Sequence, residues 1–300
     1  MLLCSFVPRG GAADGSKPGV VKGGKIFEIA GHPSIIELLR SGDDPSRARL
    51  SSEWLDLGSI KMLAPVPRPG KIVATIVNTQ GMLGGDDVGL DRPRLDMKAP
   101  SAVIGPEEEI KAPRAGVRPE VELAAIVGKR MSKATESEAE EAIAGYTVLN
   151  DVTAPADSRD DAYEAYRRDK ATGQIRKTTL RGPLFRSKNH DTFCPMGPWI
   201  ATPDENEDWT NLRMTTKFGA FVVQDGSTSE YLFGPARIAS YVSQFLTLEA
   251  GDVVSCGSVG WTREALGRLD PTEFVLPARS DVLELEIQGV GKLRNPVTFA

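Results

Sequence analysis

The chain has 300 residues, 40% of them hydrophobic and 26% charged, which is ordinary for a globular protein with a sizeable core. Thirty-six basic and 41 acidic residues give a formal net charge of −5, so the overall basic character of nucleic-acid-binding proteins is absent. Apolar runs fall far short of the roughly 20 residues of a membrane span. Three scattered cysteines without a CxxC pair predict reduced thiols and a cytoplasmic protein.

The first elements predict a small N-terminal unit. Residues 33–40 begin with Pro-Ser and then carry apolar residues at helical spacing, which predicts a short helix. Residues 62–77 change from a Pro-rich connector to a β-branched strand. This shift in composition predicts a small N-terminal domain over residues 1–69 and a larger domain over residues 70–300.

The larger domain is predicted to be rich in strands. Residues 121–126 are apolar throughout, as in a strand buried on both faces. A charged surface helix over 132–143 and a strand over 146–152 follow. Residues 157–182 are polar and predict an exposed excursion, part-helical over 160–170. The remaining expectations are a strand at 218–223, a helix at 235–245 and a final strand pair at 253–255 and 282–287. This order predicts an α+β fold with a mixed β-roll.

Two glutamates mark the start of the apolar strand. Glu120 and Glu122 are two residues apart, so in a strand their side chains point to the same face. Like charges beside a core are costly unless something neutralises them, and a hard divalent cation such as Mg²⁺, Mn²⁺ or Ca²⁺ does so directly. Asp151, at the polar end of the next strand, offers a third oxygen ligand. Spacing alone leaves open the alternative that both glutamates lie on an exposed strand end.

Other catalytic motifs are missing from the sequence. It has no GxSxG nucleophile elbow, no phosphate-binding GK[ST] loop and no GxGxxG sequence that opens a helix. The two histidines, His32 and His190, are too few for a histidine-built zinc site.

Several separated segments resemble, in the same order, motifs of the fumarylacetoacetate hydrolase family. The similarity covers roughly residues 70–297. It is carried by KAPSAVIGP at 98–106, PEVELAAIVGK at 119–129, AGYTVLNDV at 144–152, Lys188 with DTFCPMGPW at 191–199, QDGSTS at 224–229, SQFLTLEAGD at 243–252 and GVGKLRN at 289–295.

The resemblance implies a β-roll catalytic domain behind a small N-terminal domain, in a homodimer. It also implies an Mg²⁺ or Mn²⁺ site at Glu120, Glu122 and Asp151. The family acts on 2-oxo acids and 1,3-diketones: the cation captures the 2-oxocarboxylate, polarises its carbonyl and stabilises the developing enolate. Lys188 matches the active-site lysine. The positions of Gln224, Thr228 and Lys98 imply contacts with the substrate.

Some positions depart from the family pattern. The water-activating histidine is replaced by Met82, whose thioether cannot accept a proton. Pro155 and Ser158 replace an arginine and a glutamine, and the later GTPxG motif is reduced to GSVG at 257–260. These changes favour enolisation chemistry (hydration or dehydration, isomerisation or decarboxylation) over C–C bond hydrolysis.

Two alternatives remain from the sequence. The first is a C–C hydrolase of a 2,4-diketo acid that uses a different base, and the second is a non-catalytic, ligand-binding homologue. Candidates to replace the missing groups are Asp86, Asp87 or Asp91 in the altered loop and Arg159 at the start of the polar excursion. His190, two residues after Lys188, is a candidate replacement base.

Overall fold

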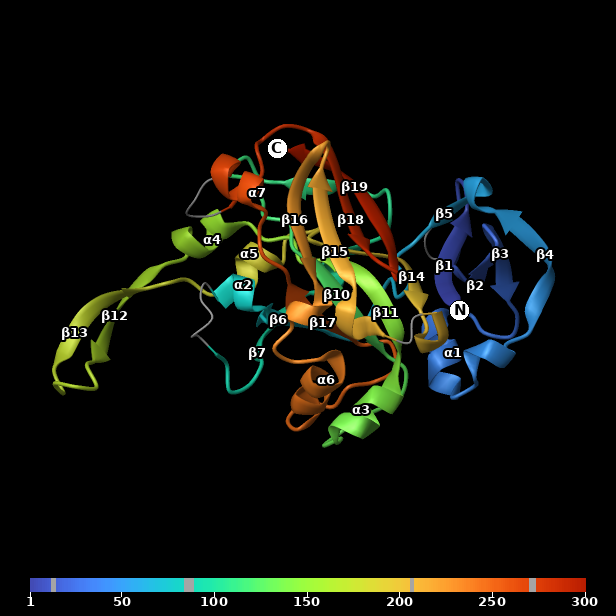
Figure 1. The fold of residues 1–300 in the computed structure, drawn as a ribbon, viewed down its shortest axis with the longest axis horizontal. Helices are drawn as coiled ribbons and strands as arrows, with labels where there is room; N and C mark the ends of the chain where they lie inside the picture. Colours follow the sequence, from blue (N-terminus) through green and yellow to red (C-terminus); the bar gives the residue numbers. More distant parts are fainter. Residues whose placement is uncertain (12–14, 84–88, 206–207, 270–273) are drawn as a thin grey trace.

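The computed structural model describes the chain except for residues 12–14, 84–88, 206–207 and 270–273. Its strands form a 12-stranded sheet, a 5-stranded sheet and a separate two-stranded hairpin. Figure 1 shows the N-terminal strands at one end of the molecule and the hairpin projecting from the opposite end. Parallel and antiparallel pairs occur in both larger sheets, so the predicted α+β class with mixed sheets is confirmed.

The N-terminal segment forms one end of the large sheet. Its strands are β1 (Leu2–Pro8), β2 (Lys17–Lys22), β3 (Lys25–Ile29), β4 (Leu50–Asp56) and β5 (Ile60–Met62). They enclose a small core of their own around Phe6 and Ile26. Helix α1 (Ile35–Ser41) begins at the capping hydroxyl of Ser34, close to the predicted helix. β1 also pairs with β14, so the sheet runs on into the rest of the chain. The division into an N-terminal domain over residues 1–69 and a second domain over residues 70–300 therefore remains a proposal.

The centre of the large sheet carries the longest buried strand. β10 (Val121–Val127) is buried at every position, as its unbroken apolar sequence predicts. It lies between β11 (Ile143–Asn150) and β17 (Val253–Ser258), both antiparallel to it. The sheet continues on one side through β14 (Cys194–Ala201) and on the other through β6 (Ile72–Val77) and β7 (Arg94–Lys98).

The five-stranded sheet packs on this centre. Its strands, in order, are β16 (Phe221–Ser227), β15 (Arg213–Phe218), β18 (Asp281–Ile287), β19 (Gly291–Phe299) and β9 (Ile110–Ala112). Leu123 of β10, Leu285 of β18 and Leu293 of β19 belong to one buried cluster, which joins the two sheets. The helices are α2 (Gln80–Leu83), α3 (Glu136–Ala142), α4 (Pro155–Asp160), α5 (Phe185–Lys188), α6 (Pro235–Ser243) and α7 (Arg263–Arg268), and β8 is Val103–Ile104.

The predicted excursion at 157–182 is exposed but not helical over 160–170. After α4 the chain forms the hairpin β12 (Tyr163–Arg168) and β13 (Ile175–Leu180). β12 carries two tyrosines and β13 carries three β-branched residues, and an ion pair of 2.5 Å between Lys177 and Glu164 crosses the hairpin. These features outweigh the helical preference of the charged residues.

Two further predictions on secondary structure were wrong. Residues 218–223 span the turn between β15 and β16 rather than one strand. The predicted final pair does not form, because β17 lies beside β10 and β6, and β18 lies in the other sheet. None of the helices in the described ranges is long and apolar enough to cross a membrane.

Candidate active site

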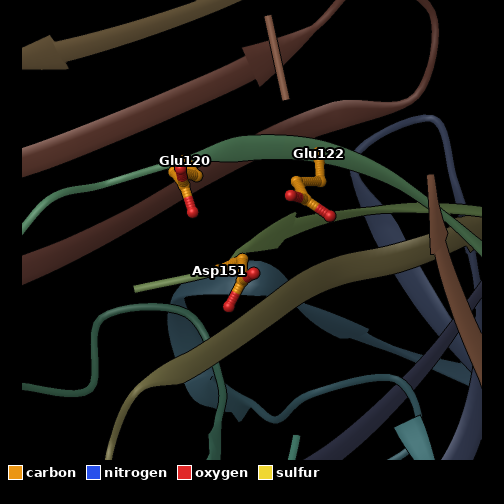
Figure 2. Close-up of side chains that lie close together, drawn as sticks. All are labelled: Glu120, Glu122 and Asp151. Carbon is orange, nitrogen blue, oxygen red and sulfur yellow. The ribbon is translucent and has the colours of Figure 1, made fainter. Parts of the chain in front are cut away.

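Three carboxylates converge where two neighbouring strands meet. Glu120 precedes β10, Glu122 lies in it, and Asp151 follows β11, which is antiparallel to β10. The Asp151 amide donates to the Glu120 carbonyl at 2.9 Å and so brings the two chain segments together. Figure 2 shows the three side chains facing a common space.

The carboxylate oxygens have the spacing and burial of a ligand set. One oxygen from each of Glu120, Glu122 and Asp151 lies within 4.8 Å of the others. The residues are only 4%, 2% and 1% exposed, which rules out the alternative of an exposed strand end. The predicted convergence of these side chains is therefore confirmed.

Two buried lysines form ion pairs with two of the carboxylates. Lys188, at the end of α5, places its Nζ 2.9 Å from Glu120 Oε2 and also donates to Asp151 Oδ2. Lys98, at the end of β7, donates to Asp151 Oδ1 at 2.6 Å, to the Val152 carbonyl at 3.1 Å and to the Lys188 carbonyl at 2.6 Å. These contacts use all three ammonium hydrogens of Lys98. Lys98 thus supports Asp151 and α5, whereas the resemblance implied contact with substrate.

Glu122 is held by the neighbouring strand β17. The Ser255 hydroxyl donates to its Oε2 at 2.5 Å and the Gly257 amide at 3.2 Å. Gly257 has a φ of +91°, and a Cβ there would lie 2.8 Å from Asn78 Cβ, so both its backbone and its neighbours require glycine. The reduced GSVG motif therefore contributes directly to the site.

Charge and burial shift the pKa values of Glu122 and Asp151 in opposite directions. Burial, with the nearby charge of Asp151, raises the pKa of Glu122 to about 8. Burial alone would also raise the pKa of Asp151, but Lys188 and Lys98 outweigh it and lower that pKa to about 2. Burial would lower the pKa of Lys188, but Asp151 and Glu120 overcome this effect and raise it above its ordinary range. Without a metal, Glu122 is therefore protonated far more readily than Asp151, which keeps its negative charge.

Two residues expected to contact substrate have other partners. Gln224 is buried: its Oε1 accepts from the Val121 amide and the Thr216 hydroxyl, and its Nε2 donates to Ser258 Oγ and the Val259 carbonyl. The Thr228 hydroxyl lies between the Trp209 carbonyl, 2.7 Å away, and the Leu212 amide, 2.8 Å away. Gln224 thus ties β16 to β10 between Glu120 and Glu122, and Thr228 ties its own turn to residues 209–212.

The replacement groups suggested by the altered segments lie elsewhere. His190 Nε2 is 2.5 Å from Asp157 Oδ2, at the contact between α4 and α5. Asp91 is exposed and pairs with Arg94, and Arg159 is exposed on α4. Asp86 and Asp87 lie outside the described residues.

Sequence reasoning missed Arg118. Its Nε lies 3.2 Å from Glu120 Oε1, and backbone hydrogen bonds of 2.8 and 3.0 Å tie the residue to Thr153. The Thr153 hydroxyl in turn donates to Glu120 Oε2 at 3.3 Å. The spacing Arg118-x-Glu120-x-Glu122 could have identified it, because alternate residues of an extended segment share a face.

A cavity of about 600 Å³ opens beside the triad at Arg118. Its other described lining residues are Gly81, Met82, Asp225, Glu230, Gly260, Trp261, Leu266 and Phe274. Met82, at the position of the family's histidine, therefore faces the same space as the side chain that contacts Glu120.

The donor set fits a hard divalent cation. All three candidate ligands are carboxylates, which Mg²⁺, Mn²⁺ and Ca²⁺ prefer, and none is a thiolate or imidazole. The cavity reaches the triad through Arg118, which lines it and contacts Glu120. Mixed sheets around a buried acidic triad place the chain in the class of metal-dependent enzyme folds.

Comparison with known proteins identifies the family. Residues 76–298 match the family described as fumarylacetoacetate (FAA) hydrolase C-terminal, and the chain belongs to this family. It is 31% identical to the 2,4-didehydro-3-deoxy-L-rhamnonate hydrolase of Sphingomonas sp. (strain SKA58), over 99% of this chain and 96% of that one. It is 30% identical to the mitochondrial oxaloacetate tautomerase FAHD2A of Bos taurus, over 97% and 87% of the two chains.

A solved structure shows the same fold. The crystal structure of 5-carboxymethyl-2-hydroxymuconate delta-isomerase from Mycobacterium smegmatis aligns over the full length of both chains with a TM-score of 0.74 and 27% identity. The relatives thus include a hydrolase, a tautomerase and an isomerase.

Proposed function

We propose that the protein is a divalent-metal-dependent enzyme acting on a small 2-oxo acid, with Glu120, Glu122 and Asp151 as the ligands of Mg²⁺ or Mn²⁺. The observation that carries this proposal is the buried convergence of the three carboxylates within 4.8 Å. When bound, the cation supplies Lewis-acid polarisation of the 2-oxo carbonyl.

The chain's own residues prepare the site. Lys98 holds Asp151, while Ser255 and Gly257 hold Glu122, so two ligands are oriented before any ion arrives. Lys188 is a protonated group that contacts two of the three carboxylates. Its ammonium can stabilise negative charge that develops on a substrate oxygen, or donate a proton to it.

We favour lyase, isomerase (tautomerase) or decarboxylase chemistry over C–C hydrolysis. Met82 lines the cavity at the position of the family's histidine, and no histidine is among the described lining residues. Hydrolysis of a 2,4-diketo acid is the second candidate, because the 31% identical Sphingomonas relative is named as a hydrolase.

Proton exchange at carbon 3 of pyruvate tests enolisation. We expect NMR in D₂O to show exchange with Mn²⁺ or Mg²⁺ and at least about 100-fold less in Asp151→Asn, because a lost ligand removes several kcal/mol of Lewis-acid stabilisation. Glu249→Gln is the matched control, since Glu249 is an exposed carboxylate paired with Arg130. Metal-independent exchange would refute the proposal, and pyruvate binding without any turnover across a 2-oxo acid panel would favour the non-catalytic alternative.

We further propose that the protein is a homodimer in the cytoplasm. The described cysteines are unpaired and buried, in keeping with a reducing compartment. The β12–β13 hairpin pairs with none of the other described strands, and Tyr166 and Ile175 are 73% and 61% exposed on it. An isolated two-stranded hairpin is only marginally stable in water. We therefore expect this hairpin to pack against a second copy of the chain. Light scattering should give twice the 32.3 kDa chain mass; a monomeric mass would refute the dimer.

A further inference from the structure

The ladder between β10 and β17 is irregular beside Glu122. The register shifts between Glu122 and Ala124, so Leu123 of β10 lies opposite two residues of β17. These two residues are Cys256 and Gly257. Two residues against one make a β-bulge, a feature that re-aims groups near functional sites. At this bulge Gly257 has a φ of +91°, and its amide donates to Glu122 Oε2 at 3.2 Å, away from the ladder.

One side chain supplies the hydrogen bonds that the ladder lacks at the bulge. The Tyr231 hydroxyl donates to the Gly257 carbonyl at 2.9 Å and accepts a long hydrogen bond from the Leu123 amide at 3.4 Å. It also lies 3.6 Å from the sulfur of Met214, which is a weak acceptor. Buried backbone groups need partners, and here a single hydroxyl bridges both strands in place of a direct backbone bond.

The position of the Tyr231 hydroxyl is fixed from outside the two strands. Tyr231 follows the 3₁₀ turn Thr228–Glu230, its amide donates to the Thr228 carbonyl at 3.1 Å, and it forms an isolated bridge with Thr79. Burial raises the pKa of the Tyr231 hydroxyl well above its ordinary value, so the group stays protonated and keeps its donor. The bulge is therefore held by a separate, anchored segment of the chain.

We propose that Tyr231 is a positioning residue of the metal site, because its hydroxyl holds the bulge in the shape that directs the Gly257 amide to Glu122. This inference rests on the proposed function, which assigns Glu122 as a metal ligand. The amide and the Ser255 hydroxyl together fix Glu122 Oε2. Loss of a hydrogen bond that orients a ligand typically weakens metal binding about 10- to 100-fold. Tyr231 acts one hydrogen bond further out, so we expect an effect near the lower limit.

Tyr231→Phe tests this role because it removes the hydroxyl and keeps the ring. Calorimetry, at a temperature well below unfolding, should show Mn²⁺ binding about tenfold more weakly than to the wild type. The matched control is Ser5→Ala, which removes another buried hydroxyl that donates to a backbone carbonyl, that of Pro65 at 2.8 Å in the N-terminal region. This distant change should leave the Mn²⁺ affinity within about twofold of the wild type.

Hydrogen exchange of the metal-free protein locates the effect without any ion. Tyr231→Phe should speed amide exchange in peptides that cover β10 and β17, because the Leu123 amide loses its acceptor and the Gly257 amide is less firmly directed. Peptides from β2 and β3 should exchange as in the wild type. Ser5→Ala should change the exchange of β10 and β17 much less than Tyr231→Phe does.

The outcomes separate this proposal from the proposed function. Weaker Mn²⁺ binding together with faster exchange in β10 and β17 supports the positioning role. Unchanged Mn²⁺ affinity in Tyr231→Phe, or an equal loss in Ser5→Ala, would leave the hydroxyl a purely structural group and overturn the role, while the metal site stands. Weaker binding without faster exchange at the bulge would overturn it too. If the wild type binds no Mn²⁺, the proposed function fails and this proposal fails with it.

Discussion

Replacing Glu122 by Gln should change how stability depends on pH in the metal-free protein. Burial raises the pKa of Glu122 from 4.5 to about 8, so folding favours the protonated acid. Below pH 4.5 the group is protonated in both states and costs nothing. As pH rises from 4.5 toward 8 the unfolded state ionises first, and stability is lost. A difference of about 3.5 units corresponds to a loss of at most about 5 kcal/mol.

The assay is urea unfolding of the wild type and Glu122→Gln with a chelator, from about pH 4.5 to 8.5. Gln does not ionise, so the wild type should lose up to about 5 kcal/mol relative to the variant across this range. Other titrating groups are common to both proteins and cancel in the difference. Adding Mn²⁺ should restore the wild type at about pH 8 and leave the variant nearly unchanged, because a cation stabilises only the form that binds it. Parallel pH profiles in the two proteins would refute the argument.

Three further changes test the surroundings of the triad. Lys98→Met leaves Asp151 Oδ1 and two backbone carbonyls without their buried donor, so the metal-free protein should lose about 3–5 kcal/mol in urea unfolding; a loss under about 1 kcal/mol would contradict the contacts. Leu123→Ala creates a cavity in the buried strand and should cost about 2–5 kcal/mol by the same assay, with Mn²⁺ affinity in calorimetry retained. Burial raises the pKa of Cys4 and of Cys194 to about 12, so native protein near pH 8 should be inert to a thiol reagent, whereas the unfolded chain should react at all three cysteines.

The candidate ligands could be predicted from the sequence because their signal is local. Glu120 and Glu122 share a strand face by the period of two, and the apolar run after them fixes which strand is buried. Their meeting with Asp151 needs only the neighbouring antiparallel strand. The family pattern added Lys188, which does lie against Glu120 and Asp151.

Residues that act through long-range contacts could not be assigned a role in the same way. Lys98 lies 53 residues before Asp151, and Gln224 lies 103 residues after Val121, so their partners depend on sheet order. Sheet order also determines the partner of residues 253–258, which pair with β10 and not with β18. The hairpin at 163–180 was missed because its strands are exposed on both faces and lack the alternation of a half-buried strand.

The lysines and the arginine around the triad act as built-in counterions. Many small metalloproteins unfold when their ion is removed, because the ligands then repel one another. Here ammonium and guanidinium groups from β7, α5 and the segment before β10 already face those oxygens. The apoprotein can therefore fold and persist without an ion, and loading becomes an exchange of one set of positive charges for another rather than a step in folding.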